Sequence, residues 1–182
     1  MPHNYIRSPK RDMDALAAAL VESWRQRKLD AKGENKLAFS GLLCTVDQPS
    51  DQPPGGANGH RCLIPRQLAA NTISQLRNMP VNAAIPRLND HARPSIVGVV
   101  QAARLGYDGV LIHGLLFNRN RPDAIQAIQA NADQLGLSFE VADTEVESES
   151  APVWRLSKLE WCGCSILARA NVAYRDSWIR VG

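Results

Sequence analysis

Two β-rich runs joined by a short glycine loop constrain the fold of this chain more than any other feature. Residues 96–104 and 110–117 are rich in branched and aromatic side chains, and Leu105-Gly106-Tyr107-Asp108-Gly109 lies between them. The glycines and the aspartate supply the backbone freedom that a hairpin loop needs. The pattern therefore predicts an antiparallel hairpin, and with it a sheet whose strands are joined locally.

The rest of the chain adds further strands and a few helices. Strands are predicted at residues 37–46, 81–88, 137–146, 153–161 and 165–170. One helix is predicted from Pro65 to about residue 78, and another from Pro122 to a left-handed stop at Gly136. Residues 47–60 carry three prolines and three glycines and are predicted to be a mobile loop beside a cleft. The predicted class is α+β, a mostly antiparallel β-barrel with two or three peripheral helices.

An amphipathic helix is predicted ahead of the first strand. Leu16, Leu20 and Trp24 recur every four residues, and Gly33 provides a stop. We expect an N-terminal helical arm at 1–36 and a barrel domain at 37–182. Two interpretations of this helix stay open: an arm that docks on another molecule, and a helix that covers its own domain.

Composition excludes several classes of protein. The chain has 182 residues, 45% of them hydrophobic, which suits one globular domain. We expect a cytoplasmic protein without a membrane span, because the apolar runs are short and the first ten residues are polar and basic. A net charge of +3 does not favour a nucleic-acid partner. The four cysteines lack metal-site spacing, so we expect reduced thiols, no metal and no cofactor.

A serine and a histidine stand where a nucleophile and its base are needed. Ser138 follows Gly136 at the predicted turn from helix to strand, and His91 precedes the hairpin. A serine hydroxyl is a poor nucleophile unless a base within hydrogen-bond reach takes its proton, and histidine suits that role near neutral pH. The oxyanion that forms also needs donors, for which the turn after Gly136 and the side chain of Arg169 are candidates.

Five short motifs occur in an order that resembles the prohead, or capsid maturation, proteases of tailed phages. They are Asp90-His91, Ser95-Ile96-Val97-Gly98, Gly114-Leu115-Leu116-Phe117, Gly136-Leu137-Ser138-Phe139 and Leu156-Ser157-Lys158-Leu159-Glu160. That family is similar to the herpesvirus assemblin proteases. The resemblance covers roughly residues 37–174, and it lies in the order and spacing of the motifs more than in any one of them.

The resemblance implies an assemblin-like barrel and a set of catalytic residues. His91 maps onto the general base of the family and Ser138 onto its nucleophile. The family commonly has an acidic residue directly after the histidine, whereas this chain has Asp90 before it. The glutamate of the family's last strand aligns with Lys158, which leaves Glu160 as the candidate for orienting the base. The catalytic unit is then a His91/Ser138 dyad or a triad with Glu160.

The function implied is that of a serine endopeptidase in phage prohead maturation. Its substrates would be the major capsid protein precursor and the scaffold protein, with self-processing as a further expectation. The resemblance places it in the host bacterial cytoplasm, inside the prohead, and allows a homodimer. No cofactor or metal is required for such a reaction.

Two other functions remain open at this point. One is a catalytically inactive capsid-associated structural or assembly protein with the same fold. The other is a nucleic-acid-binding module that uses basic residues at both ends of the chain, namely Arg25, Arg27, Lys28, Arg175 and Arg180. Taken singly, Ser138 and His91 would be read as structural residues. His113 is expected to be a satisfied barrel residue, and His60 a solvated loop residue.

Overall fold

The computed structural model describes residues 36–83 and 95–182, which belong to one compact unit, Asn35–Gly182. The predicted arm, apart from Lys36, lies outside the described residues, as does His91. The strands are β1 (Leu37–Thr45), β2 (Arg61–Leu63), β3 (Pro80–Ala83), β4 (Ser95–Leu105), β5 (Gly109–Leu116), β6 (Leu135–Val146), β7 (Val153–Ala168) and β8 (Trp178–Val181). The helices are α2 (Arg66–Thr72) and α3 (Pro122–Ala130), with short 3-10 turns η2 (Ile73–Leu76), η3 (Ala132–Gln134) and η4 (Arg169–Asn171).

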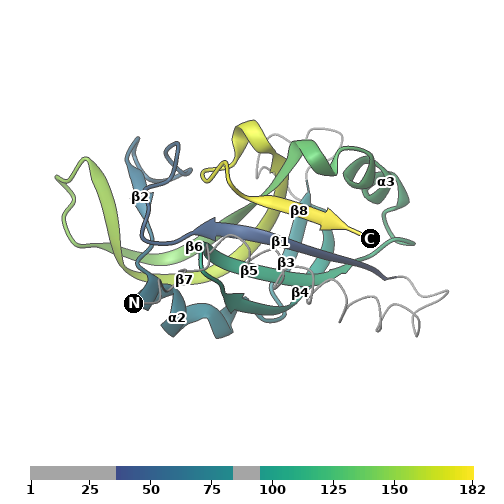
Figure 1. Ribbon diagram of the computed structural model, residues 1–182, viewed down its shortest axis with the longest axis horizontal. Coiled ribbons are helices and arrows are strands. Elements are labelled where there is room, and N and C mark those ends of the chain that lie inside the picture. Colours follow the sequence, from purple (N-terminus) through teal and green to yellow (C-terminus); the bar gives the residue numbers. More distant parts are fainter. Residues whose placement is uncertain (1–35, 84–94) are drawn as a thin grey trace, which may run out of the picture. The chain divides into compact units, whose positions relative to one another are not determined.

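The described strands form one eight-stranded mixed sheet. Its order is β2-β7-β3-β4-β5-β1-β8, with β6 paired to β7 off this path (Figure 1). Strand β7 pairs in parallel with both β2 and β3, and the remaining pairs are antiparallel. The parallel pairs were missed from the sequence because neither is joined by a local connection. The turn of the long β6–β7 hairpin lies at the opposite end of the sheet from α3 (Figure 1).

The predicted central hairpin is confirmed. Strands β4 and β5 pair antiparallel from Leu105 opposite Val110 to Gly98 opposite Leu116, with one register shift between Val100 and Ala102. Strand β5 alternates between buried and half-buried residues, because one of its faces packs on the core. This hairpin forms the middle of the sheet, with β3 beside β4 and β1 beside β5.

The predicted helix stop at Gly136 is wrong. Helix α3 ends at Ala130, and Gly136 lies inside β6, opposite Leu167 of β7. A Cβ atom at Gly136 would lie 2.5 Å from Ser177 Oγ and 3.3 Å from Val172 Cγ1. Close packing against the segment before β8, rather than a left-handed turn, therefore explains the glycine.

Strand β7 is continuous where the sequence predicted two strands. It runs through the predicted break, with a register shift where Glu140 pairs with Gly163 and Val141 pairs with Trp161. Cys162 is left without an opposite residue at this bulge, so it is exposed while Cys164 is buried. The two thiols, although two residues apart on one strand, therefore differ in their exposure to solvent.

The sheet curls until β6 packs across the core onto β1. A Cβ atom at Gly41 of β1 would lie 2.3 Å from Leu137 Cδ1 of β6, so only a glycine allows this approach. The core includes Phe39, Trp161 and Tyr174, all nearly inaccessible to solvent. The structure thus shows a curled mixed sheet where a mostly antiparallel barrel was predicted.

Helix α2 follows Pro65, as predicted, but continues after Thr72 as a 3-10 turn. It is tied to β7 by Trp161, whose Nε1 donates to Thr72 Oγ1 at 3.0 Å and whose backbone N–H donates to Gln75 Oε1 at 3.1 Å. Neither helix in residues 36–83 and 95–182 has the length and hydropathy needed to cross a bilayer.

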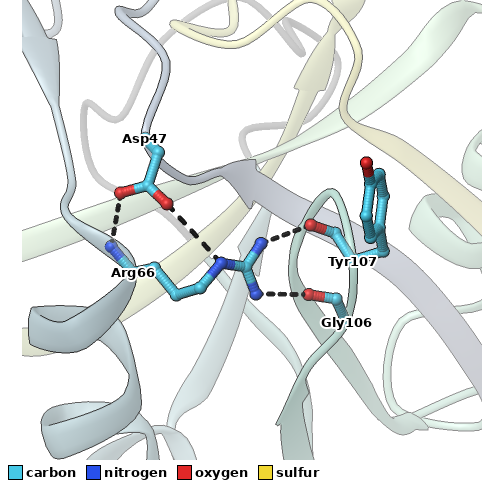
Figure 2. A network of polar contacts seen from close by, with 4 residues as sticks. All are labelled: Asp47, Arg66, Gly106 and Tyr107. Atoms are coloured by element: carbon cyan, nitrogen blue, oxygen red, sulfur yellow. Dashed lines mark hydrogen bonds and ion pairs between the residues drawn. The ribbon is translucent and has the colours of Figure 1, made fainter.

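A polar network joins three connections at one end of the sheet. Arg66, at the start of α2, donates from Nη1 to Gly106 O at 2.9 Å and from Nη2 to Tyr107 O (Figure 2). Asp47, just after β1, accepts the Arg66 backbone N–H at 2.9 Å and lies 3.5 Å from its Nε. The network holds the β4–β5 turn against the β1 end and the start of α2.

Candidate active site

Ser138 is the fourth residue of β6, within the antiparallel pair that β6 forms with β7. It pairs directly with Ser165, so the two hydroxyl-bearing residues stand opposite each other in the sheet. Ser138 is 8% exposed and Ser165 is 2% exposed. Buried hydroxyl groups in a sheet are normally hydrogen-bonded, which makes this pair the start of a polar cluster within an otherwise apolar core.

A carboxylate completes the cluster. Glu140 lies two residues after Ser138 on β6, and Ser165 Oγ donates a hydrogen bond to Glu140 Oε1 at 2.9 Å. Glu140 is half-buried and pairs with Gly163. A Cβ atom at Gly163 would lie only 2.7 Å from Glu140 Oε2, so the glycine leaves the space that the carboxylate occupies.

A cleft of about 410 Å³ opens beside this cluster. Its lining residues come from β6, from the loop after β1 and from the segment between β7 and β8; they are Pro53, Pro54, Gly55, Ser138, Phe139, Glu140, Val141, Asn171 and Ala173. Four consecutive residues of β6 thus form one wall, with Ser138 at the end of this run. The volume is in the range of small-ligand and side-chain sites.

The loop that forms the opposite part of the lining is anchored. Gln52 Nε2 donates to Val172 O at 2.7 Å and to Ala170 O at 3.1 Å. The backbone N–H of Asp51 donates to Ala173 O at 2.9 Å, and Asp51 Oδ2 accepts the Arg175 N–H at 2.7 Å. Residues 47–60 are irregular, as predicted, but these bonds hold them more firmly than a mobile loop would be held.

The thiols near the cleft are unsuited to nucleophilic attack at neutral pH. Burial, with a smaller contribution from the Glu140 charge, raises the pKa of the Cys164 thiol well above its ordinary value. Burial followed by the charges of Glu140 and Glu160 raises the pKa of Cys162. A thiol, rather than a thiolate, is a weak nucleophile, so Ser138 is the nucleophile candidate among the described lining residues.

The structure places the predicted site residues unequally. His91 lies outside the described residues. Glu160 is exposed on β7 opposite Ala142, and Ser165 lies about 17 Å farther along the strand at the usual rise per residue. Arg169, a candidate for the oxyanion, donates from Nη2 to Leu135 O at 3.3 Å. The structure therefore places Ser138 in the lining of the cleft, whereas Glu160 lies about 17 Å along β7 from the residue opposite Ser138.

The remaining histidines differ in their surroundings. The His60 ring stacks on Trp154, with centroids 4.5 Å apart and planes at 10°, and its Nδ1 lies 3.0 Å from Ala151 O. The expectation of a merely solvated loop residue is thus wrong for His60. His113 is half-buried on β5, between the buried residues Ile112 and Gly114.

Sequence reasoning missed Ser165 and Glu140 as members of the site. Ser165 was assigned only to a strand, because its proximity to Ser138 depends on the β6–β7 register. Glu140 offered one available signal, since a residue two positions from Ser138 on a strand shares its face. The strand spacing therefore indicates Glu140 as strongly as Glu160 as the carboxylate of the site.

Three comparisons relate the chain to known proteins. No protein-family model matches the sequence, and no curated protein sequence matches it significantly. Among solved structures, KSHV protease in complex with a hexapeptide phosphonate inhibitor superposes with a TM-score of 0.50 at 12% identity, over 81% of this chain and 65% of that one. Varicella-zoster virus protease gives 0.44 at 12% identity, over 80% and 64%. The bacteriophage T4 capsid assembly protease gives 0.47 at 10% identity, over 73% and 82%.

The superposition on KSHV protease confirms the assemblin-like resemblance at the level of the fold. The superposition on KSHV protease covers most of this chain, and its sequence identity is too low to say more than that the folds agree. The chain spans 65% of the length of the KSHV protease chain. Activity, substrate and partners are therefore argued from the site itself.

Proposed function

We propose that this protein is a serine endopeptidase of prohead maturation, with Ser138 as its nucleophile. The observation that carries the proposal is the position of Ser138 in a cleft of about 410 Å³, opposite Ser165, which is hydrogen-bonded to Glu140. A fold shared with a viral protease supports the same conclusion. Fold alone does not determine function, so the cleft and its polar groups matter more.

The reaction would proceed by acyl transfer. His91, the proposed base, takes the proton of Ser138 Oγ as this oxygen bonds to the scissile carbonyl carbon. The imidazolium returns the proton to the leaving amine, and the C–N bond breaks. A water molecule, deprotonated by the same base, then releases the acyl group and restores the Ser138 hydroxyl.

The tetrahedral intermediates need hydrogen-bond donors for the oxyanion. Asn171 lines the cleft, and its side-chain amide is the first proposed donor. The side chain of Arg169, two residues earlier, remains a second proposed donor through the nitrogens that do not bind Leu135 O. Such donors stabilise the charge that develops on the former carbonyl oxygen.

The proposed substrates are the major capsid protein precursor and the scaffold protein inside the prohead. This choice follows the order of motifs that resembles the prohead proteases, and a cleft formed by a strand and two loops suits an extended peptide. Confinement in a shell raises the local concentration of substrate, so a modest intrinsic rate suffices. Self-processing and association with a second copy are proposed on the same grounds.

Processing of the capsid precursor tests the proposal. The chain is co-expressed with the precursor and scaffold proteins, and the products are followed by mass spectrometry. Ser138→Ala should abolish cleavage, because none of the other described lining residues carries a hydroxyl or a thiol. Ser157→Ala, an exposed serine on β7, is the matched control and should leave cleavage unchanged. Normal processing with Ser138→Ala would contradict the proposal and favour an inactive assembly protein with this fold.

A further inference from the structure

We propose that Glu140, held by Ser165, is the positioning carboxylate of the Ser138 site. The inference rests on the proposed function and adds an acidic residue that acts through the base rather than on the substrate. It replaces Glu160 in that role. Its grounds are the β6–β7 register, one hydrogen bond, and the space that Gly163 leaves.

The strand geometry places Glu140 beside the nucleophile. Residues two apart on a strand point to the same face, and their Cα atoms lie about 7 Å apart. Both residues line the cleft, and Ser165, which pairs with Ser138, bonds the Glu140 carboxylate, as a shared face requires. A glutamate side chain extends far enough to reach a group that contacts the neighbouring hydroxyl.

The carboxylate is held in position rather than left to sample many rotamers. Oε1 accepts the hydrogen bond from Ser165 Oγ at 2.9 Å, and Ser165 is 2% exposed. Oε2 occupies the place above Gly163 where a side chain would stand. A group fixed on one side by a buried donor loses less entropy when it binds a second group.

Glu160 does not offer these features. It is exposed, lies opposite Ala142, and is separated from Ser165 by about 17 Å of strand. A glutamate side chain spans only a fraction of that distance. Glu140 is therefore the better-placed acid on the described part of the sheet.

The chemical role is electrostatic and involves no covalent step. A carboxylate next to an imidazole fixes its orientation and stabilises the imidazolium that forms when the serine proton is taken. The titratable neighbours of Glu140 on β7 are the thiols of Cys162 and Cys164, which stay neutral near pH 7 because burial raises the pKa of each. The facing loop residues Pro53 to Gly55 carry no charge.

The first experiment compares two isosteric variants on β6. Glu140→Gln keeps the shape and removes the charge, so kcat on a capsid-precursor peptide should fall about 10- to 100-fold. The acidic limb of the kcat/KM profile should move to lower pH by about one unit, because the lost carboxylate no longer favours the protonated base. Glu145→Gln is the matched control, since Glu145 is exposed on the same strand and pairs with Lys158. It should change neither quantity.

A second pair of variants separates positioning from simple structural damage. Glu140→Asp keeps the charge, so it should retain the wild-type position of the acidic limb even where kcat falls. Ser165→Ala removes one hydrogen bond from the carboxylate and keeps its charge, so kcat should fall about 3- to 10-fold with a smaller shift of the acidic limb. Equal thermal unfolding temperatures for Glu140→Gln and the wild type would show that folding is not the cause.

The outcomes distinguish this inference from the function on which it rests. If the wild type cleaves, Ser138→Ala does not, and Glu140→Gln matches the wild type in kcat and pH profile, the inference is overturned while the peptidase stands. If Glu160→Gln shifts the pH profile of kcat/KM and Glu140→Gln does not, the inference is overturned and Glu160 is the positioning carboxylate. A wild type that cleaves no precursor peptide would overturn both.

Discussion

Buried ionisable side chains make the stability of this protein depend on pH, and individual residues explain this dependence. Burial raises the pKa of the Cys44 thiol to about 12, and it raises the pKa values of Cys164 and Tyr174 further above their ordinary range. Tyr174 donates its hydroxyl hydrogen to Cys62 O at 2.8 Å, so its neutral form is also the one that the fold binds. Each of these groups stays protonated in the folded chain at pH values where it ionises in the unfolded chain.

We predict that stability falls as pH rises above about 9. Unfolded cysteine and tyrosine lose their protons near pH 8.5 and 10, so from there the unfolded state binds fewer protons than the folded state. Each such group then removes about 1.4 kcal/mol of unfolding free energy per pH unit. Urea unfolding at pH 7.5, 9 and 10.5 measures this slope.

Cys164→Ala identifies one of the groups responsible. Above pH 9, the unfolding free energy of this variant should fall less steeply with pH than that of the wild type, by the contribution of about one proton. Ser157→Ala should keep the wild-type slope. An unfolding free energy that stays constant from pH 7.5 to 10.5 would contradict the account of these buried groups.

At the scale of elements, local signals predicted what local interactions determine. The β4–β5 hairpin and the start of α2 and α3 follow from glycine loops and prolines, and the structure confirms them. Gly136 was misread because a glycine serves equally as a helix stop and as a point of close packing, and only the approach of Ser177 distinguishes the two. The sequence does not show that approach.

In the candidate site, too, local features were predictable and long-range contacts were not. Ser138 was identified from its own surroundings and its motif, and the structure places it on a cleft. Ser165 and Glu140 meet through the register of β6 against β7, which shifts three times between Glu140 and Val146. A shift of one residue would move Ser165 to the other face, so sequence alone could not predict this contact.

We predict that the loop after β1 contributes to substrate binding through its anchor. Gln52→Ala removes the hydrogen bonds to Val172 O and Ala170 O and loosens the wall that Pro53 and Pro54 form. KM should rise about 3- to 10-fold with kcat nearly unchanged, because the loop contacts substrate rather than the reacting atoms.

Steady-state kinetics on a capsid-precursor peptide provide the measurement. The matched control is Gln67→Ala, an exposed glutamine on α2 that bonds Asn71. It should leave both constants unchanged. A fall in kcat without any change in KM for Gln52→Ala would contradict a role in binding.

At the scale of the whole described unit, the site arises where distant segments converge. The curl of the sheet brings β6 against β1, and the segment between β7 and β8 binds the loop that follows β1. These contacts join the start, the middle and the end of the unit around one cleft. The superposition on KSHV protease shows a shared fold, and the Ser165–Glu140 hydrogen bond is a feature of this chain's own side chains.

Covalent labelling of Ser138 tests the central claim most directly. A fluorophosphonate reacts with an activated serine as its Oγ bonds to phosphorus and fluoride leaves, so it reports the nucleophile without knowledge of the cleavage sequence. We predict one adduct per chain on the peptide that contains Ser138, and none in Ser138→Ala. A wild-type protein that remains unlabelled at Ser138 under conditions that label a known serine protease would contradict the account.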